Sequence, residues 1–165
     1  MRLWPRNKIL ATLLAAGLSV LLFAQKFLGF MVIFVALALL VWIPYSAYVA
    51  ITKPDIRTSQ LVRVLIWMLV VPVVFGIHHL RQERMRRDAD KLVARIDEYL
   101  RTHGHYPATV DEIGMSRPQV KSMLGSPSGY FLLNGRPSLF YPATFAPFAA
   151  CSYDFKAAKW ACHAD

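Results

Sequence analysis

The chain has 165 residues and a formal net charge of +9, and 56% of its residues are hydrophobic, a larger apolar share than soluble domains usually have. Residues 1–80 contain seven basic residues and one acidic residue, whereas residues 81–165 contain twelve basic and nine acidic residues. Because most of the basic residues flank apolar runs, where lipid headgroups account for them, we exclude nucleic acid as a partner.

Three apolar runs are predicted to be transmembrane helices. They cover residues 9–24, 27–50 and 61–80. The first run has 16 residues, slightly fewer than the roughly 17–25 that cross a bilayer, so flanking residues must contribute. A secretory signal peptide is the alternative for this run. It fits less well, because Leu22-Phe23-Ala24 lacks the small-x-small cleavage pattern and another apolar run follows at once.

The other two runs carry features typical of membrane spans. The second run has no formally charged residue, and Trp42, Tyr45 and Tyr48 lie near one end, where aromatic side chains prefer the headgroup level. In the third run Arg63 lies close enough to one end to extend toward the headgroups. Pro72 lies in the middle of the third run and predicts a kink.

The orientation of the spans is predicted from the cysteines, because six Lys and Arg residues lie near the span ends on each side and the positive-inside rule does not decide. The two cysteines of the chain, Cys151 and Cys162, follow the apolar half, and disulfides persist in oxidising compartments. Two unpaired thiols are the alternative. We expect a disulfide, a cytoplasmic N-terminus and a periplasmic C-terminal domain in a bacterial inner membrane.

Residues 81–165 are predicted to be a small α+β domain, in which a long helix packs on an antiparallel sheet. The helix continues the third span without a break and ends near Thr102. A coiled-coil seam is the alternative for its apolar stripe, but the stripe covers barely two heptads, so we expect it to pack on the sheet. The stripe consists of Met85, Ala89, Leu92, Ile96 and Tyr99.

The segments after the long helix are predicted from turn and cap residues. Thr109 and Glu112 have the spacing of a capping box and predict a short helix, followed by a loop rich in Pro, Gly and Ser. Asn134-Gly135 predicts a hairpin between strands 130–133 and 138–141. A second hairpin is expected between residues 151–155 and 159–162.

The exit of the long helix has a recognisable pattern. Gly104 stops the helix, and Pro107 makes Tyr106 extended. With Tyr99 and His105, these residues resemble the "Y…G-x-YP" helix exit of pilins and type II secretion pseudopilins. The short helix, the terminal hairpins and the late cysteine pair also fit this family, and the resemblance covers about residues 73–165.

The resemblance implies a pilin-like fold and a place in a pilus or secretion-type assembly. Pilins have a short leader, a cleavage site before an aromatic residue, and a glutamate five residues into an N-terminal apolar helix. Here the helix follows the third apolar run, and no glutamate precedes Glu83. We therefore expect a pilin-like domain without the prepilin leader or processing site, tethered permanently to the membrane.

Residues that could carry chemistry do not form a catalytic pattern. Three histidine groups, at 78–79, 103–105 and 163, have no matching carboxylate or thiolate spacing for a metal. The segment 159–163 has Lys159 where a haem-attachment motif needs a cysteine. We expect no enzymatic activity, metal, cofactor or small-molecule substrate, although a membrane enzyme that uses its thiols or histidines is a third hypothesis.

The last 40 residues are rich in aromatic side chains, and alternation should place about half of them in the core of the sheet. The others are candidates for a partner surface. The leading hypothesis is a non-enzymatic accessory protein that is anchored in the lipid bilayer and binds another protein of a membrane assembly. The alternative is an immunity-type protein that neutralises a toxin acting in the periplasm or the membrane. The candidate partner-binding residues are Tyr130, Phe131, Phe145, Phe148 and Trp160.

Overall fold

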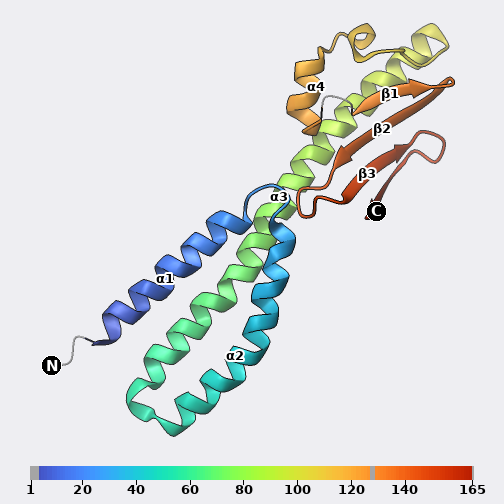
Figure 1. The fold of residues 1–165 in the computed structure, drawn as a ribbon. Coiled ribbons are helices and arrows are strands. Elements are labelled where there is room, and N and C mark those ends of the chain that lie inside the picture. The colour runs from blue at the N-terminus through green and yellow to red at the C-terminus, as the bar shows by residue number, and fades with distance from the viewer. Residues whose placement is uncertain (1–3, 127–128, 165) are drawn as a thin grey trace. The chain divides into compact units, whose positions relative to one another are not determined.

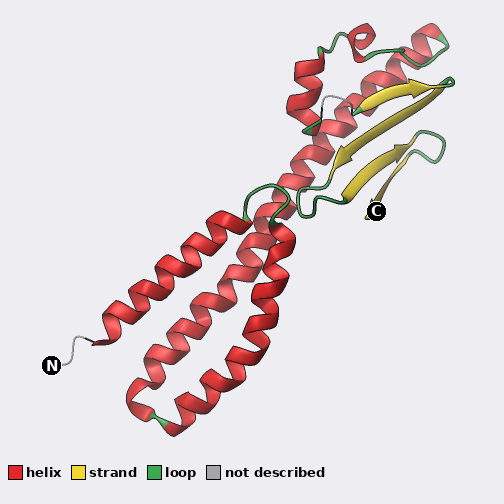
Figure 2. Ribbon diagram, viewed as in Figure 1, coloured by secondary structure: helices red, strands yellow, loops and turns green. Residues whose placement is uncertain are grey.

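The computed structural model describes residues 4–126 and 129–164, and the chain divides into two compact units, Met1–His79 and Leu80–Asp165 (Figure 1). The helices and strands are distinguished by colour in Figure 2, and α3 (Arg57–His103) belongs to both units. The first unit contains α1 (Trp4–Phe23), η1 (Gly29–Met31), α2 (Val32–Thr52), η2 (Pro54–Ile56) and the first part of α3. The second contains the rest of α3, η3 (Val110–Ile113), α4 (Arg117–Leu124), β1 (Tyr130–Leu133), β2 (Arg136–Pro142), β3 (Ala149–Asp154) and β4 (Lys159–Ala164).

Two helical segments are long and apolar enough to cross a membrane, by length and composition. They are Gly29–Thr52 and Pro54–His103, while the apolar helix Lys8–Phe23 is shorter and does not meet that length. Only 17% of each apolar window is buried inside the protein. These helices fit a membrane protein, and the described residues provide two helices of spanning length where three spans were predicted.

Polar contacts join α1 to the first part of α3. The Arg63 Nε donates to the Thr12 hydroxyl at 3.2 Å, and the His78 Nε2 lies 2.9 Å from the Phe23 carbonyl oxygen. Thr12 and His78 are both buried. Because Thr12 precedes Phe23 on α1 and Arg63 precedes His78 on α3, the two helices run in the same direction.

The second unit confirms the predicted packing of a long helix on an antiparallel sheet. Its four strands pair in the order β1-β2-β3-β4, each antiparallel to the next. The helix is continuous from Arg57 to His103, and Ala89, Leu92 and Ile96 of the predicted stripe are completely buried. They belong to one core with residues of η3, α4 and the sheet. The other core residues are Val93, Val110, Met115, Val120, Leu124, Tyr130, Leu139, Tyr141 and Cys151.

The short helix predicted at Thr109 is in fact a 3-10 turn, and α4 follows it where a loop was predicted. The Thr109 side chain makes no cap hydrogen bond, and the Glu112 carboxylate accepts from the Ala108 N–H at 3.0 Å instead. The capping box belongs to α4. Ser116 accepts from the Gln119 N–H, and the Gln119 Oε1 accepts from the Ser116 N–H at 2.8 Å. This reciprocal pairing satisfies two N-terminal donors and begins the helix.

The Asn134-Gly135 hairpin forms with a two-residue turn. Both residues have positive φ, 50° and 74°, as a type I′ turn requires. Strand β2 begins two residues earlier than the predicted strand 138–141, because Arg136 and Pro137 pair with Leu133 and Leu132. The turn therefore fixes the register of β1 against β2.

Candidate partner-binding surface

The register of the sheet places one row of side chains toward α3. Tyr130 is paired with Leu139, Leu139 with Tyr153, and Tyr153 with Trp160, so all four lie on the same face. Tyr130 is 8% exposed, and its hydroxyl donates to the Pro107 carbonyl oxygen at 2.7 Å. Burial is the main reason why the pKa of Tyr130 rises to about 12.

Trp160 also belongs to this inner face. Its Nε1 donates to the Asp90 carboxylate of α3 at 2.6 Å, and its ring packs edge-to-face against Tyr141 at a centroid distance of 5.0 Å. Tyr130 and Trp160 were predicted as partner-binding residues. Tyr130 is buried between the sheet and α3, and Trp160 is half-buried on the same face, so neither side chain lies on the opposite face of the sheet.

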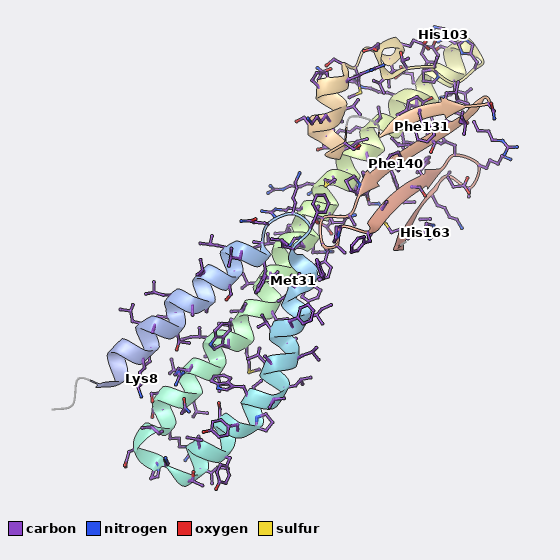
Figure 3. All side chains as sticks on the ribbon, viewed as in Figure 1. Lys8, Met31, His103, Phe131, Phe140 and His163 are labelled. Carbon is purple, nitrogen blue, oxygen red and sulfur yellow. A yellow bond between two sulfur atoms is a disulfide. The ribbon has the colours of Figure 1, made fainter. Side chains whose placement is uncertain are left out.

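The opposite face of the sheet carries a second row, which includes Phe131 and Phe140 (Figure 3). The two rings pack edge-to-face at a centroid distance of 6.1 Å. Phe131 is 42% exposed, and Leu133 on the same strand is more exposed still. Ser138, Ser152 and Ala161 beside the two rings are small, and the same face carries Arg136, Asp154 and Lys159 at one end and Pro142, Ala150 and His163 at the other. We define the outer sheet face as Phe131, Leu133, Ser138, Phe140, Ser152 and Ala161.

Phe148 lies in the loop between β2 and β3 and is 70% exposed, whereas Phe145 in the same loop is half-buried. The loop is held at both ends. The Ala143 N–H donates to the Ala149 carbonyl at 2.7 Å, and the Thr144 N–H donates to the Gln82 Oε1 of α3 at 3.1 Å. An exposed aromatic ring on an anchored loop has the properties of an interface anchor.

The predicted disulfide between Cys151 and Cys162 is present, with an S–S distance of 2.02 Å. The two residues face each other across β3 and β4. Cys151 is buried beside α3, where the Gln82 Nε2 lies 3.4 Å from its sulfur. The bond therefore joins the last strand of the sheet to the strand that contacts the core.

The residues of the helix exit hold the end of α3 against the sheet. Gly104 has a φ of 75°, and its N–H donates to the Leu100 carbonyl at 2.9 Å. Tyr106 packs edge-to-face against Phe155 at 5.6 Å, and Pro107 is completely buried. Tyr99 stacks on His103 at 4.0 Å. All four residues of the predicted motif thus have structural roles at this corner of the domain.

No protein-family model matches this chain, and comparison with curated proteins and with solved structures also gives no match. The pilin-like relationship therefore stays a prediction. Within the described part of the chain, no group of three or more His, Cys, Asp or Glu residues is placed to hold a metal ion.

Two members of the outer sheet face, Phe140 and Leu133, were missed as surface candidates. A signal for them was present, because a two-residue turn at Asn134-Gly135 pairs Leu133 with Arg136 and fixes which residues share a face. The turn residues do not predict which face of the sheet α3 covers. That choice follows from the size and shape of Tyr130, Leu139 and Tyr141 against the stripe on α3.

Proposed function

We propose that this protein is a non-enzymatic, membrane-anchored accessory protein of a pilus or secretion-type assembly, which binds a partner protein through its extracytoplasmic C-terminal domain. The outer sheet face carries this proposal. An open aromatic and aliphatic face on a small domain, flanked by an anchored aromatic loop, suits protein recognition better than catalysis.

The distribution of apolar side chains in the first unit supports the membrane anchor. Large apolar residues point outward along all three helices, including Leu14 of α1, Val41 of α2 and Leu65 of α3. Buried polar residues face the interior, among them Thr12, Ser46 and His78. This arrangement inverts that of a water-soluble bundle and matches a bilayer, where outward apolar groups meet lipid.

We propose that α1 completes a three-span anchor. Its 20 residues correspond to about 30 Å of helix, close to the thickness of the hydrocarbon core. The parallel direction of α1 and α3 is the direction that an odd number of alternating spans produces. The N-terminus then lies on the opposite side of the inner membrane from the C-terminal domain, in the cytoplasm, and the domain lies in the periplasm.

The pilin-like relationship is supported by the element order of the second unit. A long helix leaves the apolar segment, ends at a glycine, and is followed by a small antiparallel sheet with the disulfide in its last hairpin. A pilin-like domain that remains in the membrane would act beside a fibre or a secretion complex, where the outer sheet face is available to other subunits.

Site-specific photo-crosslinking in the native host tests the proposal. A photoreactive phenylalanine analogue at Phe131 or Phe148 should crosslink to a component of a pilus or secretion machine, identified by mass spectrometry. The same analogue at Thr102, an exposed position near the end of α3, is the matched control and should give no such product.

Other outcomes separate the hypotheses. A crosslink to a toxin protein would replace the assembly role by the immunity role, while the surface assignment would stand. If neither position gives a product above the Thr102 control, the outer sheet face is not a partner surface and the proposal fails.

A further inference from the structure

Basic side chains follow one side of α3 in the second unit, away from the residues that pack on the sheet. Arg84, Arg87, Lys91 and Arg95 recur in steps of three, four and four, so they lie on one face of the helix. All four are exposed. The short helix α4 adds Arg117 and Lys121, also exposed, and its sequence contains no acidic residue.

The stripe leads into a groove between α3 and α4 with a volume of about 320 Å³. No carboxylate is among the described residues that line it. Lys91 and Arg95 come from α3, and the polar residues Gln119 and Ser122 come from α4. Met115 and Met123 supply an apolar border.

Every polar side chain that lines the groove can donate a hydrogen bond. The Gln119 Oε1 already accepts from the Ser116 N–H in the capping box, which leaves the Gln119 Nε2 as the free donor of that side chain. Arg95 makes no side-chain hydrogen bond or ion pair with any described residue. Lys91 pairs with Asp88 at 2.6 Å, but this pair is exposed, and exposed pairs exchange partners at little cost.

We infer that the groove between α3 and α4 binds a phosphate-bearing anion, with a diphosphate as the best match. Lys91 and Arg95 are four residues apart, so their side chains start about 6 Å from each other on the same face. Two adjacent phosphates can therefore meet one cation each. A guanidinium binds phosphate oxygens in a bidentate manner, and Gln119 and Ser122 can donate to the remaining oxygens.

The site is separate from the outer sheet face and does not depend on the proposed partner. Two sources could present the same chemistry. A lipid headgroup would meet Arg84 and Arg87 first, because they follow Leu80 by only four and seven residues. Lys91 and Arg95 lie about 16 and 22 Å beyond Leu80 along the helix, within reach of a free diphosphate.

The test uses the full chain purified in a zwitterionic detergent and titrated with inorganic pyrophosphate by calorimetry. The wild-type protein should bind with a dissociation constant below about 1 mM. Arg95→Gln and Lys91→Gln should each weaken binding at least about tenfold, because each removes one charge-assisted contact. Arg95→Lys keeps the charge but loses the bidentate contact, so its affinity should fall between those of the wild type and Arg95→Gln. The matched control Arg136→Gln, at an exposed cation on β2, should change the affinity less than about twofold.

A second titration with a short-chain phosphatidic acid, kept below its micelle concentration, identifies the source. Tighter binding than pyrophosphate assigns a lipid headgroup whose acyl chains contact Met115 and Met123, and weaker binding assigns a free phosphate compound. Absence of pyrophosphate binding overturns the inference. Binding that Arg95→Gln leaves unchanged, in a protein that retains its circular dichroism spectrum, also overturns it, because the anion then lies elsewhere.

Discussion

The helix α3 belongs to both units, and its large apolar side chains are exposed in the first unit but buried in the second. In the first part of α3 the large side chains Leu65, Leu69 and Phe75 are exposed, whereas in the second part Leu92 and Ile96 are completely buried. Nothing in the backbone changes between them, since α3 is continuous. The difference lies in the neighbours, because the sheet covers the second part, whereas no described residue covers these large side chains of the first part. Helix formation and burial are therefore separate properties of a sequence.

The largest expected effect tests the covered part of α3. Leu92→Asp would place an unpaired carboxylate in the core, and we expect a loss of more than about 4 kcal/mol, sufficient to unfold the second unit. The measurement is protease resistance of residues 80–165 in the full chain. Ala94→Asp is the matched control, because Ala94 is exposed on the same helix and should tolerate the same charge. Equal resistance of both variants would contradict the packing of the stripe.

The second expected effect tests the apolar medium around the first unit. Val41, in the middle of α2, is 77% exposed, and in water an exposed Asp there would be harmless. In a bilayer Val41→Asp should cost roughly 3 kcal/mol of insertion free energy. We expect a smaller fraction of the protein to resist alkaline extraction from membranes.

Phe148→Asp provides the comparison for Val41→Asp. The Phe148 side chain is 70% exposed, similar to Val41, but it belongs to the second unit. Phe148→Asp should therefore leave both membrane insertion and stability nearly unchanged. If Val41→Asp behaves like Phe148→Asp, the first unit is not surrounded by lipid and the membrane anchor is wrong.

The contrast between the units also explains what the sequence could predict. The stripe on α3 and the Asn134-Gly135 turn were predictable, because each depends on residues close in the chain. The helix α4 was missed although Ser116 and Gln119 carry its capping box, because the surrounding Pro, Gly and Ser favoured a loop. The side on which the Tyr130 and Trp160 side chains lie depends on which face of the sheet α3 covers. That choice depends on contacts between residues far apart in the sequence, so local patterns do not predict it.

The third expected effect tests how the last strand is held. Replacing both Cys151 and Cys162 by alanine should lower the free energy of unfolding of the second unit by roughly 2–4 kcal/mol, the usual contribution of such a bridge. Chemical unfolding of the wild type with and without reductant should show a loss of similar size. The first unit has no disulfide, so its membrane insertion should not respond to reductant. Full alkylation of both cysteines without reductant would contradict the bond in the protein itself.

The smallest expected effect concerns the turn between β3 and β4. The Asp154 carboxylate accepts hydrogen bonds from the N–H groups of Ala157 and Lys156, at 3.1 and 2.8 Å, and these bonds lower the pKa of Asp154 below its ordinary value of 3.8. A lowered pKa means that the ionised form favours the folded state. The contribution is therefore complete well above pH 4 and is lost as the pH falls through the lowered pKa. Asp154→Ala should lower the melting temperature of the second unit slightly at pH 6, and the difference from the wild type should shrink toward pH 2. A difference that stays constant over this range would show that the carboxylate charge does not stabilise the turn.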